Sequence, residues 1–268
     1  MKTIGLVIHP TNPKAKETAD RIREDGAHRG LDVVTVDSST DHPDAILALG
    51  GDGTLLRAAQ VAWRLDVPVL GANLGNLGFL STVDPGMVDD MVQALITDIY
   101  RVEHRMMLQA TAFQGDEELY SFMALNEVVV ERDTVARVVT VRVSVGHETV
   151  ARYTADGFIV STPTGSTAYS LSAGGPVVAP DVDAVVLTAV CAHTPLWRSI
   201  VIGGSHTVFL ETPQDSVALS TDGQHLGDLQ PGGVIKVEAH PRPLKLLTAY
   251  KSHFYDKLRQ RFHVEPND

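Results

Sequence analysis

The sequence predicts an α/β domain with a parallel sheet over residues 1–100, followed by a β-rich domain over residues 101–249. Short apolar runs alternate with helical patterns in the first hundred residues, and repeated strand–helix–strand units form parallel sheets covered on both faces. Beyond residue 100, β-branched or alternating runs recur at roughly 10-residue spacing, which is typical of a β-rich domain. The length of 268 residues favours two domains.

Composition and charge restrict the class of protein. Hydrophobic residues make up 44% and charged residues 21% of the chain, which is typical of a globular protein. The 22 basic and 33 acidic residues give a net charge of −11, which argues against binding to nucleic acid or to an anionic membrane. The single cysteine, Cys191, cannot form an intramolecular disulfide, and no apolar run approaches the length of a membrane span. We therefore expect a cytoplasmic protein with no membrane or nucleic-acid partner.

Local signals predict the elements of the first domain. Residues 3–9 form an apolar run that predicts a buried strand, and Asn12 and Pro13 then supply a helix N-cap and a proline suited to the first helical turn. Gly30 is expected to end this helix. Further strands are predicted over residues 31–36, 45–49 and 67–71, with helices over residues 54–65 and from Asp84-Pro85 to Ile96.

The second domain is predicted to consist mainly of short strands separated by turn residues. The expected strands are residues 106–113, 119–130, 138–145, 149–154, 158–161, 184–190, 207–211, 217–220, 234–239 and 244–249. A helical tract is expected around residues 167–171. In residues 253–262, Phe254, Leu258 and Phe262 are spaced four apart, which predicts a helix that packs through one apolar face.

The strongest functional signal is the loop Gly50-Gly51-Asp52-Gly53-Thr54, between a predicted strand and a predicted helix. Parallel α/β domains bind ligands at the carboxyl ends of their strands, and glycines there let backbone N–H groups at a helix N-terminus approach an anion. Gly50, Gly51, Gly53 and Thr54 are therefore candidate phosphate-binding residues. A carboxylate at Asp52 is explained if it binds a metal ion or accepts a proton from an attacking hydroxyl. The alternative is a tight turn in which Asp52 caps the helix.

Two better-known phosphate loops do not fit these residues. The Walker A loop needs Lys and then Ser or Thr after its last glycine, where this chain has Thr54-Leu55. The dinucleotide fingerprint Gly-x-Gly-x-x-Gly begins at Gly51 and Gly53 but ends on Leu56. A dehydrogenase with that fingerprint is therefore the least favoured class.

Hydroxyl side chains are concentrated between Ser161 and Ser172, where eight occur. Such a tract offers donors and acceptors to a sugar, a phosphate or an amide, and it favours a binding loop over a Ser/Thr-rich surface loop. The sequence Gly165-Ser166-Thr167 lacks the flanking pattern of a nucleophile elbow, so a hydrolase serine is not predicted.

Asn126 and Glu127 are adjacent polar residues inside the strand predicted over residues 119–130. Neighbouring side chains in a strand point to opposite faces. If both are buried, each needs a partner, because an unpaired buried polar group costs roughly 1–3 kcal/mol, and a ligand ribose is one candidate. An exposed edge strand is the alternative.

Other motifs receive structural interpretations. The glycine-rich segment 71–79 follows a predicted strand, and its glycines are expected mainly to relieve backbone strain. The eleven histidines show no metal-ligand spacing, and His193 is expected to be structural. Asp222-Gly223-Gln224 is expected to be a turn.

The motifs together resemble those of the NAD kinase family. Residues 50–56 (GGDGTLL), residues 75–80 (GNLGFL), Asn126-Glu127 and residues 156–176 occur in the family's order. The first motif is shared with lipid kinases and loosely with phosphofructokinases, whereas residues 161–169 (STPTGSTAY) are much more specific. The resemblance covers nearly the whole chain and implies that the final helix, in residues 250–268, returns to the first domain. Ala192 before His193 and Ser199 after Arg198 depart from the family pattern, which puts the local backbone in question.

The resemblance implies phosphorylation of the 2′-hydroxyl of the adenosine ribose of NAD, with ATP or in some members polyphosphate as donor, to give NADP. It also implies a divalent metal ion, usually Mg²⁺, whose ligands stay unassigned, and a homodimer or homotetramer. Asp52 is implied to be the catalytic proton acceptor. The NAD-binding residues implied by motif position are Asp52, Gly53, Asn126, Glu127, Asp156, Thr167, Ala168, Tyr169, Ser170, Leu171 and Ser172, with the less distinctive Arg57, Arg137 and Gln224.

Two alternatives come from other functional classes. A lipid kinase of the diacylglycerol type would share the Gly50–Thr54 loop, but the acidic charge and the hydroxyl-rich tract argue against it. A non-catalytic dinucleotide sensor would keep the hydroxyl-rich tract without needing Asp52.

Overall fold

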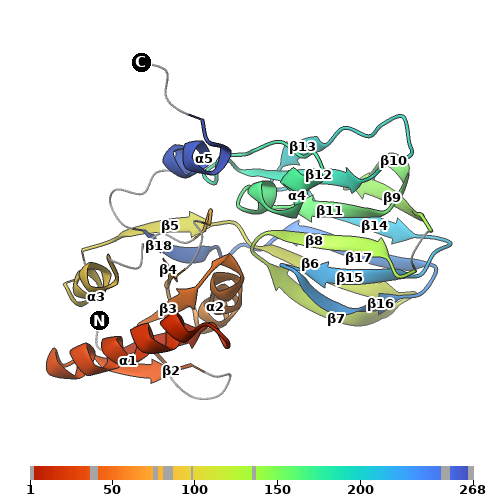
Figure 1. Cartoon of the computed structure of the whole chain (residues 1–268). Coiled ribbons are helices and arrows are strands. Elements are labelled where there is room, and N and C mark those ends of the chain that lie inside the picture. Colours follow the sequence, from red (N-terminus) through yellow and green to blue (C-terminus); the bar gives the residue numbers. More distant parts are fainter. Residues whose placement is uncertain are drawn as a thin grey trace. The chain divides into compact units, whose positions relative to one another are not determined.

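The computed structural model describes residues 3–36, 42–74, 78–80, 87–97, 99–134, 137–248 and 254–264, with Val88 and Met91 described by their backbone only. These residues form two compact units (Figure 1). Unit 1 lies within Met1–Arg105 and Leu244–Asp268, and unit 2 is Met106–Pro243 apart from residues 135–136. The α/β unit followed by a β-rich unit confirms the predicted fold class.

Unit 1 is built on one six-stranded sheet with the strand order β2-β1-β3-β4-β18-β5. Its paired strands are parallel, except that β5 is antiparallel to β18. The bounds are β1 Thr3–Ile8, α1 Pro13–His28, β2 Asp32–Thr35, β3 Ala45–Gly50, α2 Asp52–Leu65, β4 Val69–Asn73, α3 Val88–Ile96, β5 Arg101–Arg105, β18 Leu244–Thr248 and α5 Phe254–Phe262.

Helices cover both faces of this sheet. Alternate residues of β3, such as Leu47, share a core cluster with Ile22 of α1 and Leu95 of α3. Ile46, which alternates to the other face of β3, is also fully buried, and α2 packs against β3 and β4 through Leu55 and three alanines. The alternating strands and helices that the sequence predicts therefore form a parallel sheet covered on both faces.

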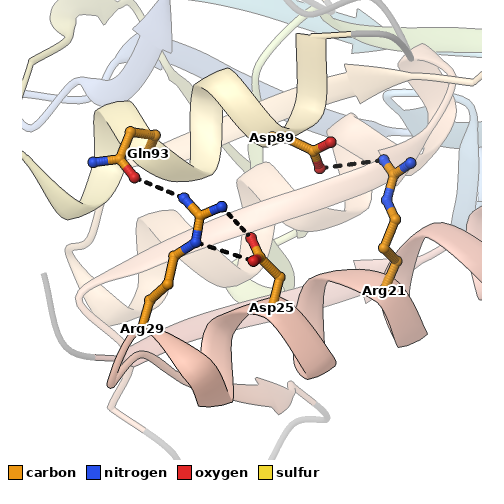
Figure 2. Close-up of polar contacts among 5 residues, drawn as sticks. All are labelled: Arg21, Asp25, Arg29, Asp89 and Gln93. Atoms are coloured by element: carbon orange, nitrogen blue, oxygen red, sulfur yellow. Dashed lines mark hydrogen bonds and ion pairs between the residues drawn. The ribbon is translucent and has the colours of Figure 1, made fainter.

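Helices α1 and α3 also meet through polar side chains at the surface. Figure 2 shows the Arg29 guanidinium between the Asp25 carboxylate, 2.9 Å from Oδ2, and the amide oxygen of Gln93 at 2.7 Å. Arg21 pairs with Asp89 at 3.4 Å. Exposed pairs of this kind contribute little stability, so the apolar residues beneath them hold the two helices together.

Several local predictions in unit 1 are confirmed. The Asn12 side chain accepts a hydrogen bond from Lys14 N at 3.0 Å and caps α1, with Pro13 at the first helical position. Gly30 follows the end of α1 with a φ of +71°, a conformation that favours glycine. The helix start predicted at Asp84-Pro85 lies outside the described residues.

Two strands belong to a different unit than the sequence suggests. Residues 101–105 and 244–248 fall within the predicted β-rich domain, but β5 and β18 pair with each other, and β18 also pairs with β4 of unit 1. Alternation with a period of two shows that a segment is a strand but not which sheet it joins. The chain therefore enters unit 2 after Arg105 and leaves it before Leu244.

Unit 2 is a sandwich of two six-stranded antiparallel sheets, ordered β10-β9-β14-β17-β6-β7 and β13-β12-β11-β8-β15-β16 (Figure 1). Inward-facing residues of both sheets, among them Val141 and Val160, share one core cluster. The bounds are β6 Leu108–Gln114, β7 Glu117–Ala124, β8 Glu127–Arg132, β9 Val139–Val145, β10 Glu148–Ala155, β11 Gly157–Ser161, α4 Tyr169–Ser172, β12 Ala184–Val190, β13 Ile200–Gly203, β14 Val208–Thr212, β15 Val217–Thr221, β16 Gln224–Leu229 and β17 Gly233–Ala239.

The single strand predicted over residues 119–130 is wrong. The segment divides into β7 and β8, which lie in different sheets, and Leu125 and Asn126 form the crossing between them. The strands β5, β13 and β16 were not among the predicted elements. In the part of the chain that the structure describes, no helix is long and apolar enough to span a membrane.

Candidate active site

The glycine loop joins β3 directly to α2 in unit 1. Gly51 occupies the N-cap position with an extended backbone, and Asp52 is the first helical residue. The N-cap residue is therefore Gly51, and not Asp52 as in the alternative. At Gly50 a Cβ would lie 2.3 Å from Oγ1 of Thr54, so this position requires glycine. The N-terminus of α2, with its positive dipole end, is suited to an anion.

Open space and an unpaired hydroxyl accompany this helix terminus. A Cβ at Gly51 or Gly53 would meet no described atom within 4 Å, so packing among the described residues does not explain these two glycines. Thr54 is 2% exposed, and its Oγ1 has no hydrogen-bond partner among the described residues. Both features suit a ligand that approaches the backbone closely.

A second glycine loop holds the Asp52 carboxylate. The Phe79 backbone N–H donates to Oδ2 of Asp52 at 3.0 Å. At Gly78 a Cβ would lie 2.1 Å from Oδ1 and 2.4 Å from Cγ of Asp52, so only glycine lets this loop approach. Residues 75–77 of the motif lie outside the described residues. Gly78 is not among the glycines with positive φ, so its close approach to Asp52 explains it, and not the relief of backbone strain that the sequence suggested.

The terminal helix packs against the same loop, as the family resemblance implies. Lys257 of α5 donates a hydrogen bond from Nζ to the Phe79 carbonyl at 3.1 Å, and the rings of Phe262 and Phe79 lie 6.4 Å apart. Burial, with the Arg105 guanidinium nearby, lowers the pKa of Lys257 to about 8, against the opposite effects of Glu103 and Asp52. Lys257 lies far from the motifs in sequence, and no sequence signal marks it.

Asn126 and Glu127 lie in unit 2, at the point where the chain crosses from β7 to β8. Asp222, in the turn between β15 and β16, accepts backbone hydrogen bonds from Leu125 at 2.9 Å, Asn126 at 2.7 Å and Glu127 at 3.3 Å. Its own N–H donates to the Glu127 carbonyl at 3.2 Å. The predicted turn at Asp222-Gly223 is confirmed, with φ values of +48° and +76°, but it also fixes this crossing.

Both polar side chains at the crossing are buried and incompletely paired. Asn126 is 6% and Glu127 5% exposed, and β8 lies between β11 and β15, so the exposed edge strand is excluded. Asn126 Oδ1 and Glu127 Oε2 have no hydrogen-bond partner among the described residues. Burial and then the nearby Asp222 carboxylate raise the pKa of Glu127 to about 8, although the Tyr169 backbone N–H lowers it.

Much of the hydroxyl-rich tract faces inward. Thr162 donates from Oγ1 to the Leu125 carbonyl at 2.6 Å, and Ser166 donates from Oγ to the Pro163 carbonyl at 2.7 Å. Ser170 lies 3.0 Å from Thr188 Oγ1. These hydroxyls are buried and therefore hold the tract in place, so the Ser/Thr-rich surface loop is excluded.

The tract also passes close to the crossing. At Gly165 a Cβ would lie 2.2 Å from the Asn126 carbonyl oxygen, which explains this glycine. Thr162 N donates to the same oxygen at 2.8 Å. The side chains that remain at least partly exposed at the end of the tract are those of Thr167, Ala168, Tyr169, Leu171 and Ser172.

The remaining predicted residues divide between the two units. Tyr169 donates from its hydroxyl to Glu131 at 2.7 Å, and Arg132 pairs with Asp156 at 3.0 Å, which places Tyr169 and Asp156 beside β8. Arg57 is exposed on α2 of unit 1, whereas Arg137 and Gln224 are exposed in unit 2. Sequence reasoning gave Asp222 and Gly78 only a place in a turn and in a loop motif, and it did not identify Glu131, Arg132 or Lys257. Within unit 2 the structure brings Asn126, Glu127 and Tyr169 together.

Models of one protein family match segments in both halves of the chain. Residues 31–100 match the ATP-NAD kinase N-terminal domain, and residues 125–249 match the ATP-NAD kinase C-terminal domain. The NAD kinase of Symbiobacterium thermophilum is 45% identical over 81% of this chain and 78% of its own. The NAD kinase of Moorella thermoacetica is 36% identical over 97% of this chain and 89% of its own.

Solved structures of the same fold include two described as kinases of this type. An NAD kinase from Archaeoglobus fulgidus in complex with ATP has a TM-score of 0.78 at 26% identity, covering 98% of both chains. Yeast NADH kinase complexed with NADH has a TM-score of 0.86 at 23% identity, covering 100% of this chain and 89% of its own, and shows a shared fold. Because both family domains match and the similarity to the Moorella protein extends over nearly its whole length, the chain belongs to the NAD kinase family.

Proposed function

We propose that the chain transfers the γ-phosphoryl group of ATP to the 2′-hydroxyl of the adenosine ribose of NAD, which yields NADP and ADP. The observation that carries this proposal within the family is the pair of buried, unpaired oxygens on Asn126 and Glu127. An unpaired buried polar group costs roughly 1–3 kcal/mol, and ribose hydroxyls are donors that would remove this cost. A Glu127 carboxyl with a pKa of about 8 is protonated near neutral pH and can also donate a hydrogen bond to a ribose oxygen.

The proposed NAD-binding residues come from both units. Asn126, Glu127 and the exposed end of the hydroxyl-rich tract are supported by their proximity in unit 2. The full proposed set is Asp52, Gly53, Arg57, Asn126, Glu127, Arg137, Asp156, Thr167, Ala168, Tyr169, Ser170, Leu171, Ser172 and Gln224. Within it, Ser170 is buried against Thr188, so we expect it to act mainly by holding its neighbours in position.

Asp52 is the proposed proton acceptor. As the 2′-oxygen forms its bond to the γ-phosphorus, the bond from that phosphorus to the bridging oxygen of ADP breaks, and the hydroxyl proton passes to the Asp52 carboxylate. Phosphoryl transfer depends mostly on positioning and charge stabilisation, so a weak base suffices when it aligns the hydroxyl. The hydrogen bond from Phe79 N–H to Oδ2 supports this role because it fixes the carboxylate orientation.

The phosphate groups of ATP are proposed to bind at Gly50, Gly51, Gly53 and Thr54. The open space at Gly51 and Gly53 and the unpaired Thr54 hydroxyl support this assignment. Among the residues that the structure describes, no three His, Cys, Asp or Glu side chains form a metal cluster. Mg²⁺ usually keeps several waters and is held together with substrate phosphates, so the ATP phosphates proposed at this loop would supply protein-independent ligands for it. Bound in this way, Mg²⁺ would neutralise charge on the triphosphate.

An NADP-formation assay tests the proposed function. Purified protein is incubated with Mg²⁺ and ATP, and with NAD or diacylglycerol as acceptor. The proposal predicts NADP and no phosphatidic acid, whereas a lipid kinase would give the reverse. Calorimetric binding of NAD without NADP formation would instead support a dinucleotide sensor. Parallel reactions with NADH and with polyphosphate define the acceptor and donor range.

The family resemblance also leads us to expect a cytoplasmic enzyme that forms a homodimer or homotetramer. Light scattering coupled to size-exclusion chromatography would measure the assembly, and cell fractionation would measure the location. A monomer at assay concentrations, or recovery with the membrane fraction, would contradict these two expectations.

A further inference from the structure

Helix α5 connects directly to the residue that holds Asp52. The backbone N–H of Phe79 donates to the Asp52 carboxylate at 3.0 Å, while the carbonyl of Phe79 accepts from Lys257 Nζ at 3.1 Å. Both polar groups of one residue are therefore occupied, one by the proposed base and the other by a cation on the terminal helix. The ring of Phe262 packs near the Phe79 ring, which gives the same helix a second contact.

We propose that Lys257 is a positioning residue for the phosphoryl-transfer reaction, acting through Phe79 on the carboxylate of Asp52. This inference rests on the proposed role of Asp52 as proton acceptor. Gly78 leaves no space between its loop and that carboxylate, so the loop position determines where the carboxylate lies. A hydrogen bond from a half-buried ammonium group to the loop carbonyl restrains that position more than a neutral donor would.

Charged groups from two other elements, β5 and α2, act on Lys257. Arg105 and Glu103 come from β5, where they form an ion pair with each other, and Asp52 comes from α2. Burial and Arg105 favour the neutral amine, whereas Glu103 and Asp52 favour the ammonium. With a pKa of about 8, the ammonium form predominates below that pH and is lost above it. Turnover should therefore decrease as the pH rises through about 8.

Three variants separate positioning from general stability. Lys257→Met removes the charge and the donor with little change in length, whereas Lys257→Arg keeps the charge at all accessible pH values. Lys245→Met is the matched control. Lys245 also donates a hydrogen bond to a backbone carbonyl in unit 1, that of Asp66 at 3.1 Å. It lies on β18, however, and its side chain is at the surface. Melting temperatures and calorimetric NAD affinities show whether each variant is folded.

The kinetic readout is kcat at saturating NAD and ATP between about pH 6.5 and 9.5. For Lys257→Met we expect kcat near pH 7 to decrease roughly tenfold, with KM for NAD within about twofold of wild type, because a small displacement of a reacting group is costly. Wild type should lose turnover above about pH 8, whereas Lys257→Arg should restore most of the activity and keep it there. Lys245→Met should match wild type throughout.

Failure of this inference is distinguishable from failure of the proposed function. If wild-type protein forms no NADP, the proposed function fails. If wild type forms NADP but Lys257→Met retains its kcat and pH profile, the positioning role alone is overturned. A Lys257→Arg profile that decreases at the same pH as wild type would also overturn it, because the decrease would then belong to another group.

Discussion

The carboxylate of Asp222 accepts a hydrogen bond from the backbone N–H of Asn126 at 2.7 Å, although 96 positions separate the two residues in the sequence. The same carboxylate accepts from the N–H groups of Leu125 and Glu127. One side chain in a tight turn therefore fixes the backbone that carries both proposed ribose ligands. It also places a negative charge near Glu127, which contributes to the raised pKa of that residue.

Replacing Asp222 should weaken NAD binding. In Asp222→Asn, an NH₂ group would replace one carboxylate oxygen and face a backbone N–H donor, so at least one hydrogen bond is lost. We expect KM for NAD to rise roughly tenfold, since lost charge-assisted hydrogen bonds cost about 1.5–3 kcal/mol each. Steady-state kinetics measures this change. Asp228→Asn is the control, because Asp228 lies on the adjacent β16 in an exposed pair with His225, and an unchanged KM in both variants would contradict the role of Asp222.

Glu127 should make the stability of the free enzyme decrease with pH. Its pKa is about 8 in the folded protein but near 4.5 when exposed, so the folded state retains a proton that the unfolded state has lost. This contribution to stability is complete below about pH 4.5 and disappears as the pH rises through about 8. Between pH 6 and 9, the melting temperature of wild type should therefore decrease by roughly 4 °C relative to that of Glu127→Gln, whose side chain stays neutral.

Thermal unfolding without nucleotides, followed by circular dichroism, measures this difference. Glu148→Gln is a suitable control, because Glu148 is exposed in unit 2. Parallel pH dependences for wild type and Glu127→Gln would show that Glu127 does not carry the retained proton.

Gly78→Ala should reduce turnover while NAD still binds. A Cβ there would overlap the Asp52 carboxylate at 2.1 Å, so the carboxylate or the loop must move. We expect kcat to decrease by roughly 10²-fold, because a misplacement of about 1 Å can have that effect. Gly203→Ala is the control. Its new Cβ would meet only His206 ring atoms at 3.3 Å or more, so activity should be retained. Equal kcat values for the two variants would contradict the account of this loop.

The sequence predicts features that depend on neighbouring residues. Asn12 and Pro13 determine the start of α1 locally, and the Gly50–Thr54 loop marks its own strand-to-helix junction. The family motifs likewise identify Asp52 and Asn126-Glu127, because their residue types and order are distinctive.

The features that the sequence does not predict depend on contacts between distant residues. Residues 119–130 read as one strand because apolar residues lie on both sides of the polar pair Asn126-Glu127, and nothing local shows that the two halves join different sheets. The bonds of Asp222 to Asn126 and of Lys257 to Phe79 each connect segments that only the fold brings together. The hydroxyl-rich tract is distinctive by composition, but only the structure separates inward-facing hydroxyls such as Thr162 from partly exposed ones such as Thr167.

The turnover of Asp52→Asn is the most direct test of Asp52 as the proton acceptor. Asparagine keeps the size of the side chain and an oxygen for the Phe79 N–H, but it cannot take up the proton. We predict that NADP formation decreases by at least roughly 10²-fold, while the calorimetric affinity for NAD stays within about threefold of wild type. Turnover close to wild type in Asp52→Asn would contradict the account.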